Sequence, residues 1–187
     1  MTSEAQSDMT IDLQPTLRGV LVHLRPLRDD DWTPLFAVAC DPQIWAQHPA
    51  SDRYQEDVFR EFFRVAMASQ SALIALDASD GRVIGSSRYA NYDTVTCEIE
   101  IGWTFLARSH WGGRVNGEMK RLMLDHAFQF VDRVRFTIGP NNVRSQMAVQ
   151  RIGGVLLGTQ IVRGAESVIY TVSKPSSAAA ITGHDAG

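Results

Sequence analysis

Apolar side chains recur at helical spacing in four stretches of the chain, so that each stretch has one apolar and one polar face. The first stretch follows Asp29–Asp31, whose carboxylates suit the start of a helix, and it stops at Asp41-Pro42. The last begins at Asn141 or Asn142, either of which can cap a helix. The pattern therefore predicts four helices, over residues 32–40, 56–66, 115–131 and 142–152.

Short apolar runs and alternating segments between these helices predict about seven strands. The sequence Ser79-Asp80-Gly81 is typical of a turn and predicts a β-hairpin. The expected strands are residues 20–24, 73–76, 82–89, 97–105, 134–138, 155–157 and 167–172, which makes the element order βααβββαβαββ. The clearest alternation puts Glu98 and Glu100 on one face of a strand and, on the other, Cys97, Ile99, Ile101, Trp103 and Phe105.

The composition favours a single folded unit. A hydrophobic fraction of 44% in 187 residues is enough for one sizeable core. Residues 1–16 and 173–187 are rich in small and polar side chains and show no apolar periodicity. We therefore expect two flexible tails around one domain of residues 17–172.

Charge and cysteine content argue against several functional classes. The formal net charge of -3, without a long basic stretch, disfavours nucleic-acid binding. Cys40 and Cys97 have no Cys or His neighbours at metal-ligand spacing, so neither a zinc site nor a disulfide framework is expected. No export signal and no run of about 18 apolar residues is visible. We expect a cytoplasmic protein without a membrane span or a bound metal.

The segment from Thr104 to Glu118 is the strongest candidate for chemistry. A strand ends there, a loop containing Gly112 and Gly113 follows, and the longest helix begins. Unpaired amide N–H groups and the positive end of the helix dipole suit an anion, and the two glycines let a phosphate approach the backbone. Glycine at such a turn also has a purely steric explanation, so the local sequence leaves both interpretations open.

The order and spacing of several short motifs favour the functional interpretation. They are His23-Leu24-Arg25-Pro26-Leu27, Val83-Ile84-Gly85, Glu98–Trp103, Trp111-Gly112-Gly113, Asn142–Ser145 and Ile152-Gly153-Gly154. In these motifs the chain resembles the GNAT superfamily of acetyl-coenzyme-A-dependent N-acyltransferases, and within it the RimJ/RimL-like branch. The resemblance implies an α/β (α+β) fold with a mixed, mostly antiparallel central sheet flanked by helices. It also implies acetyl-CoA as donor and a primary amine, of a small molecule or a protein N-terminus, as acceptor.

The phosphate-binding loop departs from the family pattern Gln/Arg-x-x-Gly-x-Gly/Ala. Alignment on Trp111-Gly112 puts Arg114 and Asn116 where the family has small residues. A guanidinium can still donate paired hydrogen bonds to a phosphate, and an amide side chain can orient a phosphate or an amide. The alternative is a loop that no longer binds the cofactor. The expected phosphate-side residues are Trp111, Gly112, Gly113, Arg114, Val115 and Asn116.

The resemblance implies direct transfer, in which the amine attacks the thioester without a covalent enzyme intermediate. The pantetheine arm is then expected between parted strands, and the oxyanion near a backbone N–H of Thr104–Leu106. Glu100 is the preferred base and Glu98 the second candidate. Alternatively, either carboxylate faces water or pairs with Arg88 or Arg135 on a neighbouring strand. The backbone expected to contact the arm belongs to Trp103, Thr104, Phe105 and Leu106.

The superfamily often uses a tyrosine of the last helix to protonate the leaving thiolate, but no tyrosine lies between Asn141 and Ile152. Ser145 is the hydroxyl best placed for this role, and Asn142 is expected to hold the pantetheine amides. Both residues also have structural explanations, Asn142 as a helix cap and Ser145 as a small packing residue.

Four further residues are weaker candidates. His110 and His23 rank below Glu100 as bases. Trp45 and Tyr54 flank a polar loop where the family builds one wall of the acceptor site, so they are candidate substrate contacts. Exposed strand edges near the C-terminus favour a homodimer. The alternative function, from a different class, is a catalytically inactive module that binds coenzyme A or a protein partner.

Overall fold

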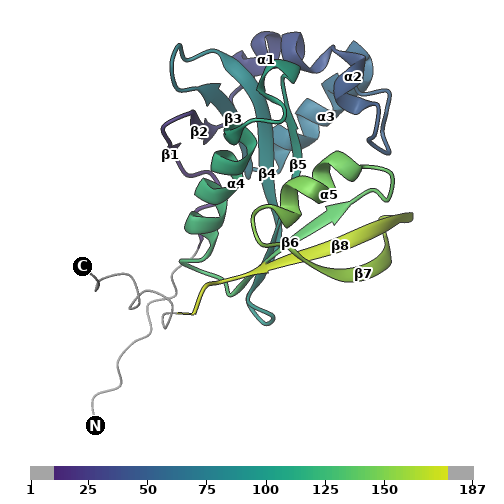
Figure 1. Ribbon diagram of the computed structural model, residues 1–187. Helices are drawn as coiled ribbons and strands as arrows, with labels where there is room; N and C mark the ends of the chain where they lie inside the picture. Colours follow the sequence, from purple (N-terminus) through teal and green to yellow (C-terminus); the bar gives the residue numbers. More distant parts are fainter. Residues whose placement is uncertain (1–10, 177–187) are drawn as a thin grey trace, which may run out of the picture.

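The computed structural model describes residues 11–176, which form one mixed sheet with helices on both faces (Figure 1). In this range the strands lie in the order β1-β2-β3-β4-β5-β6-β8-β7, and only β5 and β6 pair in parallel. The strands are β1 (Leu17–Arg18), β2 (Val22–Pro26), β3 (Ala72–Asp77), β4 (Val83–Asp93), β5 (Glu98–Leu106), β6 (Arg133–Ile138), β7 (Val155–Val162) and β8 (Ala165–Ser173). The helices are α1 (Trp32–Ala39), α2 (Pro42–Trp45), α3 (Glu56–Ala68), α4 (Arg114–Ala127) and α5 (Val143–Gln150).

This architecture confirms the predicted α+β fold with a mostly antiparallel sheet, and it adds the short strand β1, the short helix α2 and two 3-10 turns at Asp29–Asp31 and Arg108–His110. β1 has two residues, too few for a periodic pattern to reveal. α2 begins at Pro42, and the carboxylate of Asp41 accepts a hydrogen bond from the Gln43 N–H at 3.0 Å. The pair Asp41-Pro42 therefore ends α1 and also starts the next helix.

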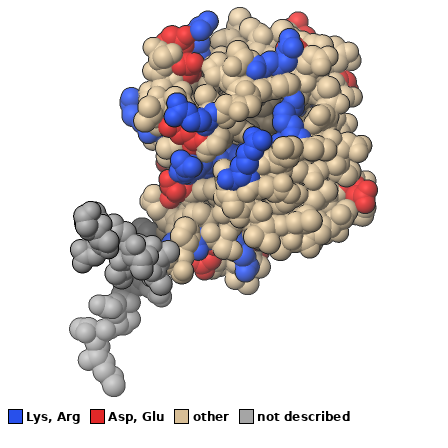
Figure 2. All heavy atoms as spheres, viewed as in Figure 1, with Lys and Arg blue, Asp and Glu red and all other residues tan. Residues whose placement is uncertain are grey.

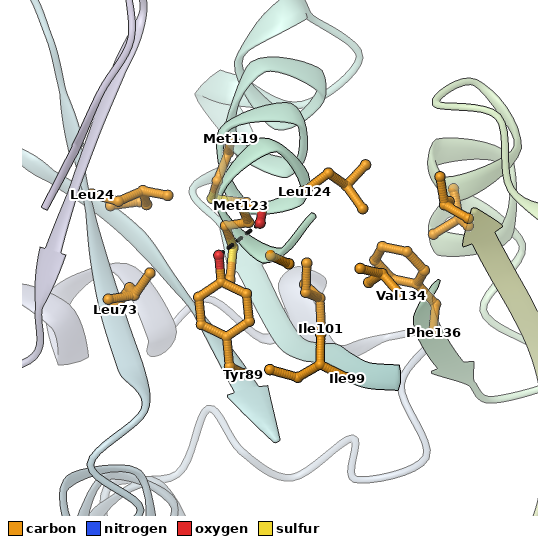
Figure 3. Close-up of a cluster of buried hydrophobic side chains, with 14 of the residues drawn as sticks. Leu24, Leu73, Tyr89, Ile99, Ile101, Met119, Met123, Leu124, Val134 and Phe136 are labelled. Atoms are coloured by element: carbon orange, nitrogen blue, oxygen red, sulfur yellow. Dashed lines mark hydrogen bonds between the residues drawn. The ribbon is translucent and has the colours of Figure 1, made fainter. Parts of the chain in front are cut away.

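Two apolar clusters hold the helices to opposite faces of the sheet. α4 covers one face, where Met123 packs in the same cluster as Ile101 of β5 (Figure 3). Tyr89 of β4 fixes this contact, because its hydroxyl donates a hydrogen bond of 2.8 Å to the Met123 carbonyl. α1 and α3 cover the other face, where Phe59 meets Phe105 with ring centroids 5.9 Å apart. The end of β5 is thus packed from both sides.

The packed part of the chain begins before residue 17. Ile11 is buried in the α4-side cluster, and the backbone oxygen of Asp12 lies 2.7 Å from Nε2 of His126 in α4. The expected flexible tail over residues 1–16 therefore does not hold for residues 11–16, since Ile11 and Leu13 both pack against this cluster. The rest of the two expected tails, residues 1–10 and 177–187, lies outside the described residues.

A β-bulge at Trp103 changes which face the later residues of β5 occupy. Trp103 has a left-handed backbone with φ of 52°, and the register against β4 shifts between Arg88↔Gly102 and Ser86↔Phe105. The predicted alternation put Ile101, Trp103 and Phe105 on one face. It holds only up to the bulge, because one extra residue inverts the direction of the side chains that follow.

β5 and β6 pair over three residues only, from Glu98↔Arg133 to Glu100↔Arg135. β5 continues to Leu106 and β6 to Ile138 without further pairing, so the two strands part. From Ile101 onward, the edge of β5 that faces β6 has backbone groups without a strand partner. The candidate site is built around this gap.

Candidate active site

The parted strands open into two connected hollows. The outer groove, of about 600 Å³, lies between α2, the end of β5, the start of α4, and α5. The inner chamber, of about 370 Å³, lies between β5 and β6 and reaches the turn between β7 and β8. The two share lining residues and form one cleft, and Lys and Arg side chains gather around this hollowed face (Figure 2). The shared residues are His48, Thr104, Lys120, Asn142 and Ser145.

The outer groove ends at the N-terminus of α4. Gly113 is the cap residue, no side chain caps the helix, and no acidic residue lies in its first turn. Gly112 has a φ of 67°, and a Cβ added at Gly112 or Gly117 would meet nothing within 4 Å. Here the backbone is open to a ligand, and its N–H groups and the helix dipole favour an anion.

Arginines bring further positive charge to the outer groove. Arg121 of α4 and Arg151, directly after α5, line it with exposed side chains. Arg144 of α5 lies with its guanidinium 3.8 Å from the ring centroid of Trp111. Trp111 is itself anchored, because its indole N–H donates to the Leu106 carbonyl at 2.9 Å. The groove therefore combines helix amides with side-chain cations.

Arg114 lies at the start of α4 but outside the lining of the groove. Its side chain is exposed and does not line the groove, and Val115 packs against the α4-side core. The face of α4 that points into the groove carries Asn116, Gly117 and Lys120 instead, since residues three and four apart share a helix face. Gly117 is open on this face, because a Cβ added there would meet nothing within 4 Å.

The expected polar residues of α4 and α5 do meet in the cleft. Asn116 lines the outer groove, and its side-chain oxygen is buried without a hydrogen-bond partner. Asn142 is buried and caps α5, since its Oδ1 accepts a hydrogen bond of 3.1 Å from the Ser145 N–H. Asn142 thus combines the capping role with a place in the cleft.

Of the two candidate bases, only Glu100 lies in the cleft. It is 4% exposed and lines the inner chamber, and its carboxylate accepts hydrogen bonds from Asn91 Nδ2 at 2.5 Å and Arg163 Nη2 at 3.1 Å. Glu98 lines neither hollow and lies 3.6 Å from Arg133. The salt-bridge partner of Glu100 is therefore neither of the strand arginines considered as alternatives, but one from the turn between β7 and β8.

Lys120 of α4 is a cleft residue that the sequence analysis missed. It is 6% exposed, and its Nζ lies 5.0 Å from the ring centroid of Phe136 on β6. Burial without a compensating charge lowers the pKa of Lys120 from 10.5 to about 8. A signal was present in the sequence, because Lys120 shares the apolar face of the predicted helix with Met123.

His48, in the loop after α2, is a second missed residue at the junction of the two hollows. Its Nδ1 accepts a hydrogen bond from the Ala50 N–H at 3.0 Å, and its Nε2 lies 3.3 Å from Nη1 of Arg53. Burial, assisted by the charge of Arg53, lowers the pKa of His48 from 6.5 to about 4. Its imidazole is therefore neutral at pH 7.

The remaining candidates are only partly in the cleft. Trp45 is buried and lines the outer groove, with its indole N–H donating to the Ala39 carbonyl at 2.8 Å. Tyr54 is 38% exposed and lines neither hollow. His110 lines the outer groove with Nε2 3.0 Å from the Asp77 carboxylate, and His23 lies outside the cleft.

The residues present fit coenzyme A. Open helix amides beside Arg121 and Arg151 suit a diphosphate, and the unpaired edge of β5 suits an arm that carries amides. The buried oxygen of Asn116 still needs a donor. Within residues 11–176, no group of three or more His, Cys, Asp or Glu could hold a metal ion, and no helix is long and apolar enough to cross a membrane.

Comparison with known proteins agrees with this geometry. A family model described as an acetyltransferase (GNAT) domain matches residues 22–155, whereas no curated protein matches the chain. A GNAT-family structure from Chromobacterium violaceum is 20% identical, with a TM-score of 0.78 over 92% of this chain and 93% of that chain. A GCN5-related N-acetyltransferase from Brucella melitensis is 20% identical, with a TM-score of 0.75 over 86% and 79%. Mycobacterium smegmatis RimJ, solved with CoA-disulfide, is 21% identical, with a TM-score of 0.66 over 86% of each chain.

Proposed function

Because the chain belongs to the GNAT acetyltransferase family, we propose that it transfers the acetyl group of acetyl-CoA directly to a primary amine. The observation that supports this most strongly is the parting of β5 and β6 after Glu100. The gap produces one cleft with an anion-binding helix terminus at its outer end and a buried carboxylate at its inner end. A donor that carries phosphates can therefore enter the cleft at its outer end, and an amine acceptor can reach the acyl group from the inner end.

The outer groove is proposed to hold the donor. The amides of Gly112 and Gly113 and the first turn of α4, with Arg121 and Arg151, bind the phosphates. The open backbone of residues 103–106 pairs with the arm in the manner of an added strand, and Asn116 and Asn142 bind its amides. When bound, acetyl-CoA supplies an acetyl group activated as a thioester.

Glu100 is proposed as the general base, because it is the only carboxylate among the lining residues of the inner chamber. Asn91 and Arg163 hold its carboxylate in place, and it takes a proton from the acceptor ammonium directly or through water. Glu98, outside the cleft, is not part of this proposal.

Lys120 is proposed as the group that returns a proton to the leaving thiolate. Its Nζ lies where groove and chamber join, and at pH 7 it is mostly protonated with a pKa of about 8. A donor whose pKa is near the working pH transfers a proton efficiently. The hydroxyl of Ser145 approaches the same junction from α5 and can share the role.

The test is thermal melting with and without acetyl-CoA, followed by an amine panel scored by release of the CoA thiol. A ligand at about 100 times its Kd stabilises the fold by about 2.7 kcal/mol. No shift in melting temperature at saturating acetyl-CoA would contradict the donor site and favour a non-catalytic module. A shift without thiol release on any amine would contradict the transferase while retaining the donor site.

The sheet edge formed by β7 supports a homodimer as part of this proposal. Four apolar side chains on this strand are more than half exposed, which is an unusual surface for an edge strand of a monomer. They are Val155, Leu156, Leu157 and Ile161. Light scattering should give a dimer mass for the native chain and a monomer mass for Ile161→Lys, and a native monomer would contradict the proposal.

A further inference from the structure

The inner chamber holds more positive charge than its single carboxylate balances. Arg53, Lys120 and Arg163 line it together with Glu100. Glu100 and Arg163 already form a salt bridge at 3.1 Å, so this pair is close to neutral. Arg53 and Lys120 form no salt bridge with any residue between 11 and 176.

Arg53 is held by aromatic rings rather than by an acid. The centre of its guanidinium lies 4.7 Å from the ring centroid of Phe62 and 5.6 Å from that of Trp45, and its one polar side-chain contact is His48. Burial, with repulsion from Arg88, lowers the pKa of Arg53 from 12.5 to about 10, so it stays charged at neutral pH. A guanidinium has five N–H donors in a planar fork, and most of those of Arg53 have no acceptor among residues 11–176.

Two further arginines flank Trp103 at the β5 bulge. The guanidinium of Arg88 lies 3.8 Å from the ring centroid and that of Arg163 lies 4.8 Å from it. Arg88 is 7% exposed, and its Nε is buried without a hydrogen-bond partner. Arg88 of β4 and Arg163 of the turn between β7 and β8 thus bring two cations to the ring of Trp103, and the positive charge near Glu100 does not come from the Arg53 loop alone.

Buried cations without acidic partners are costly, and they repel a second cation that enters the same chamber. A polyamine or a lysine-rich peptide would bring additional positive charge to this place. An acceptor with a carboxylate would instead supply the two planar oxygens that the fork of a guanidinium binds. A chamber of about 370 Å³ is also of the size that small ligands occupy.

We propose that the acceptor is a free amino acid, whose carboxylate is bound by Arg53 while its amine faces Glu100. The inference rests on the proposed transferase function and adds the substrate class. Lys120 and Arg88 contribute to the positive potential of the chamber, and Phe62 and Trp45 hold the guanidinium of Arg53 beside it.

The experiment uses the full-length protein and compares amino acids with their carboxamides as acetyl acceptors. The twenty amino acids, their carboxamides and two polyamines are assayed with acetyl-CoA by thiol release. Calorimetry on the CoA-loaded protein then measures binding of N-acetylamino acids and N-acetylamino amides, a readout that needs no turnover. We expect at least one amino acid to exceed its amide by tenfold or more in kcat/KM, and its N-acetyl product to bind at least tenfold more tightly than the N-acetyl amide.

Variants identify the residue responsible for this preference. Arg53→Gln should bring the ratio of kcat/KM for the amino acid to kcat/KM for its amide close to one. Arg53→Lys should retain part of the preference for the acid. Arg60→Gln is the matched control, because Arg60 also stacks on an aromatic ring, 4.4 Å from the Trp32 centroid, but is exposed and outside the cleft. The control should keep the native ratio.

The outcomes separate this inference from the proposed function. A preference for amides, polyamines or peptides, an Arg53→Gln ratio equal to the native one, or no binding of any N-acetylamino acid overturns the acceptor class, although the transferase can stand. Absence of any acetyl-CoA-dependent melting shift overturns the proposed function itself.

Discussion

Replacing Lys120 by Met should stabilise the fold and at the same time impair catalysis. Lys120 is almost completely buried, and its ammonium has no carboxylate partner in the described part of the chain. The depression of its pKa from 10.5 to about 8 corresponds to about 3 kcal/mol of unfavourable free energy in the charged folded state. Met preserves the volume of the stem and removes the charge. We therefore expect Lys120→Met to gain about 3 kcal/mol at pH 7, or about 6–12 °C in melting temperature for a domain of this size.

The pH dependence makes this prediction specific. The folded-state pKa of Lys120 is depressed, so between pH 8 and 10.5 the unfolded chain binds a proton that the folded chain has released. The free energy of unfolding of the native protein should rise through this window. The difference in free energy of unfolding between Lys120→Met and the native chain should therefore shrink by about 2.5 kcal/mol between pH 7 and pH 10. Below pH 8 the full difference of about 3 kcal/mol between the variant and the native chain is expected.

Urea denaturation at pH 7 and pH 10 measures the difference, with Arg121→Met as the control because Arg121 is the next residue and is exposed. The reasoning would be refuted if Lys120→Met were less stable than the native chain at pH 7, or if the difference between them did not change with pH. A stabilised variant that also releases thiol at least tenfold more slowly would show that the buried charge serves the reaction.

Three further predictions concern other cleft residues. Glu100→Gln should lower acetylation at least a hundredfold while the acetyl-CoA melting shift is kept, and unchanged rates across the pH range would remove Glu100 from the mechanism. Arg121→Ala should weaken acetyl-CoA binding, more at low than at high salt, whereas Arg114→Ala should not, and calorimetry showing the reverse would restore Arg114 to the phosphate site. His48 has a depressed folded-state pKa, so the native chain should lose up to about 3 kcal/mol of stability as the pH falls from 6.5 to 4; a His48→Gln variant with the same slope in denaturation experiments would contradict this.

Much of the fold could be predicted because its signals are local. Helical periodicity located α1, α3, α4 and α5, and apolar runs located all strands except the two-residue β1. The bulge at Trp103 could not be predicted, because a left-handed tryptophan leaves no mark on a pattern of alternating polarity. It nevertheless decides that Phe105 and Ile101 face opposite sides of the sheet.

The candidate site was predicted in outline only. Gly112, Gly113, Asn142 and Ser145 lie in the cleft, as their motifs suggested, and Glu100 does as well. Glu98, Arg114 and Tyr54 lie outside it, since spacing along a strand or helix does not specify which face a neighbouring element covers. Arg53 was missed for the same reason, whereas Lys120 was missed although its place on the apolar face of the predicted helix was a signal.

The amino-acid sequence by itself determined the order of the helices and strands apart from β1 and α2, the glycine-rich entry to α4 and the family to which these belong. These features follow from backbone geometry and from the partition of apolar side chains, and both act within a few residues. The tertiary structure alone decided that Glu100 would meet Arg163, 63 residues away, and that Lys120 and Arg53, which have no acidic partner in the described part of the chain, would face the same chamber. Such encounters depend on which groups lose water when distant elements pack together, and that is defined only once the chain has folded.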